Sequence, residues 1–512
     1  MDCVSVGVGA LSIDDVVNVA RYDAPIEISE DAMKTMASTR SRVEDLAKDP
    51  TPVYGISTGF GALAKRHIPE DMRAQLQKSL VRSHAAGSGP EVEREVIRAL
   101  NLLRISTLCT GRTGVRPEVA QCYAKLLNAG ITPIVHEFGS LGCSGDLAPL
   151  AHSALVLLGE GRARTKDGKE ITGAEACSLA GFEPIELKEK EGLALINGTD
   201  GMLGQLCLAI DDIRRLVTTV DIATAMSLEG LNGTATVFAA DLQELRPHPG
   251  QAVAAANVLK VVEGSGILEA AAEDFAINQV QDAYSVRCSP QVAGGVRDTL
   301  SHAIFVANNE LAAAVDNPVV AKDGRVTSNG NFHGAPLAYV LDFLAIVTAD
   351  LASISERRTD RFLDPARNRG LNAFLADDPG VDSGHMIAQY TQAAIVSEMK
   401  RNAVPASVDS IPSSAMQEDH VSMGWSAARK LRRNVDGLTR VLAVEILTAA
   451  RAIDMRGGEP GVGTKAVIDV LRRTVDGPGP DRFLAPDIQH TVDLVASGDI
   501  VRAAADAAGE LG

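Results

Sequence analysis

Long stretches with helical periodicity and no proline constrain the fold of this chain more than any other feature. From Val421 to Ala450 no proline occurs, and only Gly424 and Gly437 interrupt the pattern. Similar patterns cover residues 337–354 and 386–399. Between residues 296 and 315, apolar side chains recur at the three- and four-residue intervals of one helix face: Val296, Leu300, Ile304, Ala307, Leu311 and Val315. Helices of this length normally pack as a bundle, so we predict a long-helix bundle in the second half of the chain.

The first part of the chain is predicted to be more mixed. A short strand is expected over residues 4–8, and helices are expected to begin near Ser12 and Ser29, each with acidic residues soon after the cap. A glycine-rich loop follows over residues 52–64, before helical patterns resume over residues 69–84 and 91–110. We therefore expect a loop-rich N-terminal part, residues 1–199, and a second part, residues 200–512, that holds the bundle and a C-terminal helical segment.

Charge and cysteine usage limit the classes of partner and compartment. The 512 residues include 49 Lys+Arg and 66 Asp+Glu, which gives a formal net charge of −17, and no long basic run occurs. Nucleic acid and anionic membranes are therefore poor partner candidates. The most apolar span, residues 336–351, contains Asp342 and Asp350, which favours a buried helix over a membrane span. Seven single cysteines without a Cys-x-x-Cys pair, and an N-terminus without a signal-peptide pattern, favour a reducing cytoplasm and no metal site.

The run from Gly139 to Leu150, Gly-Ser-Leu-Gly-Cys-Ser-Gly-Asp-Leu-Ala-Pro-Leu, carries the most specific chemistry. Gly145 has no side chain, so its backbone nitrogen can approach the carbonyl carbon of Cys143 closely. Attack there closes a five-membered ring, and loss of water from the ring and of the Ser144 hydroxyl leaves an electrophilic methylene that no unmodified side chain supplies. A less specific interpretation is a glycine-rich turn in which Asp146 caps a helix with a proline in its first turn.

This run resembles the signature of the aromatic amino-acid ammonia-lyases, whose prosthetic group is 4-methylidene-imidazol-5-one (MIO). The resemblance implies a mainly α fold, a long-helix bundle of the ammonia-lyase and fumarase/aspartase type. It also implies that MIO forms autocatalytically from Cys143, Ser144 and Gly145, with no external cofactor. The family most often has alanine where this chain has Cys143, and since the ring takes only backbone atoms there, a small cysteine is expected to be tolerated. Its thiol would lie beside an electrophile, so we expect inhibition by alkylating reagents, more so if Arg287 favours the thiolate.

Two further loops match the family's catalytic loops. Tyr54, in the run Tyr-Gly-Ile-Ser-Thr-Gly-Phe-Gly, matches the mobile-loop tyrosine that removes the β-proton, although a reference pKa of ~10 must be lowered for this role or the enzyme must work at alkaline pH. Asn197 matches the asparagine that contacts ring and substrate, because a carboxamide both donates and accepts hydrogen bonds. Taken alone, the tyrosine would be a loop anchor and the Asn-Gly pair an ordinary turn.

The runs at residues 281–288 and 328–334 also match the family. Arg287 is suited to bidentate capture of the substrate carboxylate, and the resemblance places Tyr284 near the ring and Gln281 in the pocket. Phe332 matches a phenylalanine that packs near the ring. The ordinary alternatives are a structural ion pair for the arginine and a core position for the phenylalanine.

Two positions point to the choice of substrate. His84 and Glu418 match the histidine branch of the family, whereas the phenylalanine and tyrosine branches differ at both positions. Glu418 can accept a hydrogen bond from an imidazole, and a pocket for phenylalanine would not contain a carboxylate because a buried unpaired charge is costly. The alternatives are a core histidine and a glutamate at the N-terminus of the helix near Val421.

The resemblance thus implies deamination of L-histidine to trans-urocanate and ammonia by a cytoplasmic homotetramer whose active sites are built from several subunits. A tyrosine or phenylalanine ammonia-lyase, or an aminomutase, of the same family remains open. A catalytically inactive helical scaffold is the alternative from another class of protein.

Overall fold

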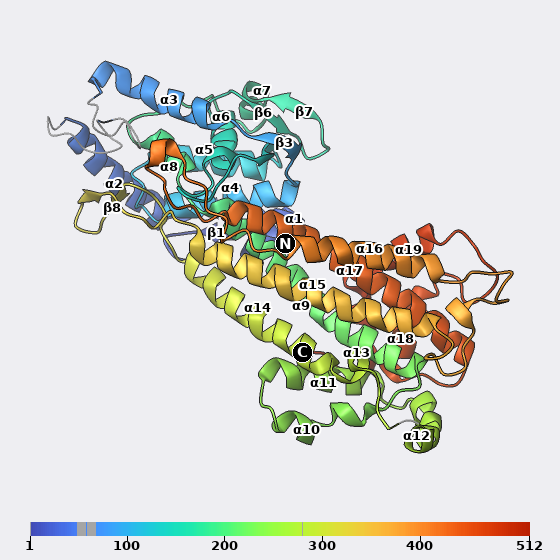
Figure 1. Cartoon of the computed structure of the whole chain (residues 1–512). Helices are drawn as coiled ribbons and strands as arrows, with labels where there is room; N and C mark the ends of the chain where they lie inside the picture. Colours follow the sequence, from blue (N-terminus) through green and yellow to red (C-terminus); the bar gives the residue numbers. More distant parts are fainter. Residues whose placement is uncertain (1, 49–57, 59–67, 279) are drawn as a thin grey trace. The chain divides into compact units, whose positions relative to one another are not determined.

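The computed structural model describes residues 2–48, 58, 68–278 and 280–512 (Figure 1). Within these residues the chain is mainly helical, as expected, and its strands form only small sheets of two or three strands. The elements follow in the order β1 (Val4–Val6), α1 (Ile13–Tyr22), β2 (Ile26–Ile28), α2 (Glu30–Lys48), η2 (Glu70–Met72), α3 (Arg73–His84), β3 (Ser88–Glu91), α4 (Arg94–Cys109), α5 (Pro117–Asn128), β4 (Thr132–Pro133), β5 (His136–Phe138), α6 (Leu147–Leu157), β6 (Arg162–Arg164), β7 (Glu170–Thr172), α7 (Gly173–Leu179), α8 (Glu191–Ile196), α9 (Asp200–Gly230), η3 (Ala235–Phe238), α10 (Ala240–Glu244), α11 (Pro249–Val261), α12 (Gly266–Asn278), α13 (Tyr284–Arg287), α14 (Ser289–Leu311), β8 (Val319–Val320), β9 (Val326–Thr327), α15 (Ala335–Leu363), η4 (Ala373–Leu375), α16 (Met386–Asn402), η5 (Ser414–Met416), α17 (Gly424–Arg456), α18 (Val462–Leu471), α19 (Ala485–Ser497) and α20 (Asp499–Ala508).

The chain divides into two compact units. Unit 1 comprises residues 1–211, 304–342 and 405–429, and unit 2 comprises residues 212–303, 343–404 and 430–512. Our expected boundary near Thr199 differs from this division, which is discontinuous in sequence. The reason is that the long helices α9, α14, α15 and α17 each have residues in both units, so a single cut cannot separate them.

The predicted N-terminal elements of unit 1 are confirmed, with shifted ends. β1 pairs in parallel with β2, and α1 begins after Ser12, whose side chain forms a capping box with Asp15. The helix expected from residue 91 begins only at Arg94, because Ser88–Glu91 forms β3, which pairs antiparallel with β5. Of the expected loop over residues 52–64, only Thr58 lies within the described residues.

Three helices of unit 1 bring the ends of distant segments together. Helices α3, α6 and α8 pack against one another in all three pairs. Helix α3 ends at His84, α6 begins one residue after Asp146, and α8 ends one residue before Asn197. The packing of three short helices therefore gathers the loops that carry the predicted chemistry.

Unit 2 contains the bundle that the periodicity predicts. The Glu445 carboxylate on α17 accepts hydrogen bonds from Ser227 of α9 (2.7 Å) and Ser355 of α15 (2.5 Å), and it pairs with Arg358 of α15. Gln392 of α16 donates to the carbonyl of Val441 on α17 (2.8 Å). Buried polar contacts of this kind fix the register of helices whose apolar faces would otherwise pack in several ways.

The structure also tests two predictions about single helices. In α14 the predicted stripe is buried except at Ile304, which is half-buried, and Val315 lies beyond the helix end. Helix α15 is long and apolar enough to cross a membrane by length and composition, but 61% of its most apolar window is buried inside the structure. That burial is typical of the core helix that we predicted.

Candidate active site

The predicted ring-forming tripeptide lies in a tight loop between β5 and α6. Gly145 has φ +74° and forms an isolated parallel bridge with Gly198. A Cβ at this position would lie 2.0 Å from the Gly198 carbonyl oxygen, and the adjacent Asp146 N–H donates to that same oxygen at 2.7 Å. Both the positive φ and the close backbone approach require glycine at position 145.

Loops from two other segments hold the ring-forming loop in place. The carbonyl of Gly142 accepts hydrogen bonds from the Ser422 hydroxyl (2.8 Å) and from the Gly334 N–H (3.1 Å). The carbonyl of Leu141 accepts from the Met423 N–H at 2.8 Å. The tripeptide is thus built on a scaffold that joins segments far apart in sequence.

Asp146 stands at the N-cap position of α6, as the alternative interpretation expected, but its side chain does not cap the helix. Its carboxylate is fully buried and accepts from the Ser140 hydroxyl (2.9 Å) and from the Met202 N–H (2.9 Å). Burial raises the pKa of Asp146 to about 7, against the opposing effect of these donors. Asp146 therefore links the ring-forming loop to the first turn of α9.

A buried ion pair fixes the backbone around Asn197. The Arg104 guanidinium donates to the carbonyls of Ala194 (2.9 Å) and Asn197 (3.0 Å) and pairs with Asp200 at 2.6 Å. The Asn197 Nδ2 donates to the carbonyl of Asn317 at 3.2 Å, whereas its buried Oδ1 has no hydrogen-bond partner among the described residues. The amide therefore retains an unused acceptor.

The Glu418 carboxylate contacts the ring-forming tripeptide directly. Its Oε1 accepts from the Ser144 hydroxyl at 3.1 Å, and its Oε2 accepts from the Cys143 thiol, also at 3.1 Å. The Ser413 hydroxyl donates to the same Oε2 at 3.1 Å, and the backbones of Ser413 and Glu418 form an antiparallel bridge. Helix α17 begins only at Gly424, so the glutamate is not a helix-terminal charge.

These contacts bear on our expectation for the Cys143 thiol, which stays a prediction. Burial, together with the hydrogen bond to the Glu418 carboxylate, raises the pKa of Cys143 to about 12. A carboxylate neighbour disfavours the thiolate, which is the reactive form of cysteine. The contact therefore favours the thiol, which donates to Glu418, over the thiolate.

His84 lies at the C-terminus of α3, half-buried. Its Nδ1 is 2.9 Å from the carbonyl oxygen of Leu80, and because a carbonyl only accepts, Nδ1 carries the proton and Nε2 is an acceptor. Burial lowers the pKa of His84, while the Leu80 carbonyl and the nearby Glu418 charge oppose the shift. The structure thus brings a neutral imidazole and a carboxylate to the same region of unit 1.

Phe332 and Tyr54 complete the predictions for unit 1. Phe332 is half-buried and lies two residues before Gly334, whose N–H binds the ring-forming loop. Tyr54 lies outside the described residues, so its role stays a prediction.

The remaining predicted residues form a separate group in unit 2. The Arg287 guanidinium lies over the Tyr284 ring, 4.6 Å from its centroid, and the buried Arg287 Nε has no hydrogen-bond partner among the described residues. The carbonyl of Ser285, in the same short helix α13, accepts from Arg358 at 3.1 Å. Gln281 is exposed at the start of this segment. A cation–π contact and a buried arginine thus fix the segment that presents the guanidinium.

Several supporting residues were not predicted from the sequence. Ser413, Arg104 and Arg358 position predicted residues, and Lys190 and Asp316 form a fully buried ion pair. Only Ser413 had a signal, its place in the polar loop before Glu418. The arginines lie within helical sequence, where nothing marks them as inward-facing.

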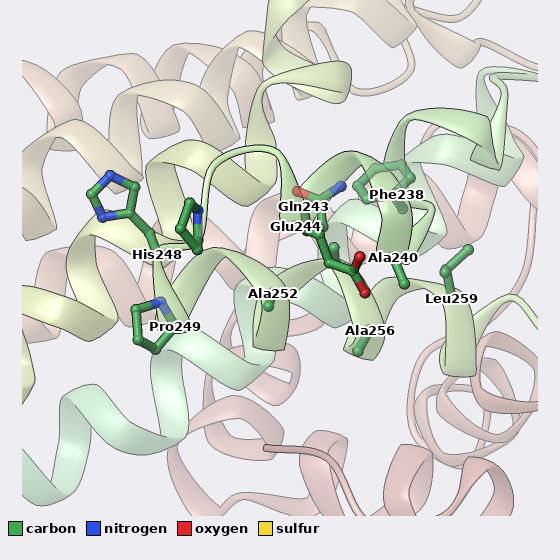
Figure 2. Close-up of a pocket in the computed structure, with 11 residues that line it drawn as sticks. Phe238, Ala240, Gln243, Glu244, His248, Pro249, Ala252, Ala256 and Leu259 are labelled. Atoms are coloured by element: carbon green, nitrogen blue, oxygen red, sulfur yellow. The ribbon is translucent and has the colours of Figure 1, made fainter.

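Unit 2 also holds a cavity (Figure 2). It has a volume of about 380 Å³ and is mostly apolar, with His248 and Glu244 among its polar groups. Its walls come from η3, α10, α11 and the turn between the two α-helices. None of the residues predicted to act on substrate lines it.

Comparison with known proteins gives consistent matches over nearly the whole chain. Residues 11–473 match the family model described as aromatic amino acid lyase. Histidine ammonia-lyases of Streptomyces avermitilis and Streptomyces coelicolor are each 61% identical over 513 residues, covering 100% of this chain and 100% of each relative. A tyrosine aminomutase structure from Streptomyces globisporus has a TM-score of 0.93 at 37% identity, covering 98% of both chains. The histidine ammonia-lyase structure from Trypanosoma cruzi has a TM-score of 0.90 at 37% identity, covering 98% of this chain and 95% of that one. The matched structures confirm the fold class that the sequence predicted.

Proposed function

The chain belongs to the aromatic amino acid lyase family, and we propose that it is a histidine ammonia-lyase, which converts L-histidine to trans-urocanate and ammonia. The observation that carries the proposal is the Glu418 carboxylate beside the ring-forming tripeptide. A carboxylate at this place suits an imidazole side chain and disfavours a purely apolar one. The 61% identity to relatives named histidine ammonia-lyase supports the same substrate.

The residues present fit the prosthetic group MIO. Gly145 occupies a position that only glycine can take, and the Ser144 hydroxyl, which the modification removes, is accessible to an acceptor group. Cys143, Ser144 and Gly145 would form the group, which supplies an electrophilic carbon that makes the substrate nitrogen a better leaving group.

The other residues bind, orient and move protons. We assign to Arg287 the bidentate capture of the substrate carboxylate, with Tyr284 stacked against it and Gln281 in the pocket. His84 and Glu418 hold the imidazole, and the Glu418 carboxylate accepts a hydrogen bond from the imidazole N–H.

Three residues act nearer the reacting atoms. Tyr54 takes the β-proton of the substrate onto its phenolate oxygen. Asn197 offers an amide that is already fixed by Arg104, so its orientation costs little when charge develops. Phe332 forms a wall of the pocket.

We further propose that the enzyme is a cytoplasmic homotetramer. All seven cysteines are free, which suits a reducing compartment. Large apolar or aromatic side chains are exposed on the single chain, among them Tyr284 (70%) and Phe305 (64%), which suits burial between subunits.

Two measurements test the proposal. Intact mass should be lower than the translated mass by two waters, about 36 Da, and the Ser144→Ala variant should keep its full mass and lose turnover. Purified enzyme should then release ammonia and urocanate from L-histidine faster than it converts L-tyrosine or L-phenylalanine. A β-amino acid product would indicate an aminomutase instead, and a fully active enzyme of unmodified mass would refute MIO.

A further inference from the structure

The two oxygens of Glu418 have different partners. Oε1 accepts from the Ser144 hydroxyl, while Oε2 accepts from both the Cys143 thiol and the Ser413 hydroxyl, each at 3.1 Å. The Cys143 side chain is only 6% exposed, so water does not compete effectively for its S–H. Formation of the ring affects the hydrogen-bond donors of the two oxygens differently.

Formation of MIO removes the Ser144 oxygen as water and therefore removes the hydrogen bond to Oε1. Neither the Cys143 sulfur nor the Ser413 oxygen is consumed, because the ring takes only backbone atoms from position 143. The modification thus removes the donor to Oε1 and consumes neither of the donors to Oε2.

We propose that Cys143 is a positioning residue for substrate choice: its thiol, together with Ser413, holds Oε2 of Glu418 so that Oε1 is the oxygen offered to the substrate imidazole. The inference rests on the proposed function, because it assumes a substrate with an imidazole. A glutamate side chain has several rotatable bonds, and fixing it before the substrate arrives removes an entropic cost from binding. Donors on Oε2 also leave Oε1 with free lone pairs for an imidazole N–H.

Binding of two matched ligands separates this role from a merely structural one. Urocanate and cinnamate are both aryl acrylates, and only urocanate has ring nitrogens that can pair with Glu418. In the Cys143→Ala variant we expect complete loss of two waters by intact mass. We also expect calorimetry to give a urocanate Kd weaker by roughly 3- to 10-fold, with the cinnamate Kd unchanged within about twofold. Cys143→Ser, which restores a donor of similar size, should recover most of the urocanate affinity.

A double-mutant cycle with Glu418→Ala gives the second test. Without the carboxylate, Cys143→Ala should not weaken urocanate binding further. The proposal is overturned if Cys143→Ala binds urocanate as the wild type does, or weakens cinnamate equally. It is also overturned if the effect persists in the Glu418→Ala background, or if the ring fails to form.

Wild-type turnover of L-histidine, measured alongside, separates the two proposals. Absent turnover with a complete ring rejects the proposed function. Normal turnover with any of the overturning results rejects only the positioning role.

Discussion

Asp146→Asn should make the chain more stable at neutral and alkaline pH, although it replaces a residue at the centre of the site. The asparagine has the same shape. Its amide oxygen can accept from the Met202 N–H, and its NH₂ can donate to the Ser140 hydroxyl in place of the hydrogen bond that Asp146 accepts. The substitution therefore removes the charge and keeps both contacts.

The magnitude follows from the pKa of about 7 in the folded chain. In the unfolded chain an aspartate titrates near ~3.9, and one pKa unit corresponds to about 1.4 kcal/mol. Because the folded pKa is raised, the folded state holds its proton longer, and stability is lost as pH rises from about 4 to about 7 and is then constant. The penalty grows from roughly 1–2 kcal/mol at about pH 5 to roughly 4 kcal/mol at about pH 8.

The assay is urea unfolding of both proteins at a fixed protein concentration between about pH 5 and about pH 8. A Ser144→Ala background keeps ring formation from differing between the two. We expect the free energy of unfolding of the asparagine variant, relative to its parent, to increase by about 2–3 kcal/mol over this range. A pH-independent difference, or one of opposite slope, would refute the reasoning that burial outweighs the hydrogen bonds to Asp146.

Four further predictions address other residues. Glu418→Gln should lower kcat/KM for L-histidine by roughly 10- to 100-fold, since a charged acceptor is lost; steady-state kinetics would contradict this if the loss were under about twofold. Tyr54→Phe should lower kcat by at least about 100-fold with little change in KM, and an unchanged kcat would move the base role elsewhere. The pKa of Cys143 is raised to about 12, so iodoacetamide at about pH 8 should inactivate the wild type and Cys143→Ala at equal rates. Faster loss of activity in the wild type would support a reactive Cys143 thiol instead. Gly198→Ala should lower the free energy of unfolding by about 3–5 kcal/mol, because the new Cβ would lie 1.9 Å from the Arg104 guanidinium and displace the buried Arg104–Asp200 ion pair. An unchanged midpoint of urea unfolding would show that the ion pair can move to accommodate the methyl group.

The helical fold could be predicted from sequence because apolar periodicity reports which face of a helix is buried. The stripe through Val296 and Leu300 is buried as predicted. Helix ends were less predictable, as at Arg94, because a strand pairing with β5 competes for the preceding residues. The division into units was not predictable, since a helix such as α17 continues through both and its periodicity contains no boundary.

The candidate site was predictable where residue type and neighbours together specify a chemistry. Gly145 is such a case, and the structure adds its physical reason, the close approach to Gly198. Arg104 was not predictable, because an arginine within a helix is usually solvated, and only the arrangement of α4 and α8 reveals that it is buried. The contacts of Asp146 were not predictable, because a residue at an N-cap position normally caps, as the alternative interpretation of this run expected.

Two of the residues that we assign to the substrate each have a buried side-chain atom without a hydrogen-bond partner among the described residues. Asn197 Oδ1 in unit 1 is a buried acceptor, and Arg287 Nε in unit 2 is a buried donor, and neither has a partner among the described residues. Leaving such an atom unpaired costs about 1–3 kcal/mol, which a hydrogen bond to a ligand would recover. An amino acid carries an ammonium group that donates and a carboxylate that accepts. By charge, an acceptor such as Asn197 Oδ1 suits an ammonium group and a donor such as Arg287 Nε suits a carboxylate, and in the proposed function Glu418 pairs with the imidazole.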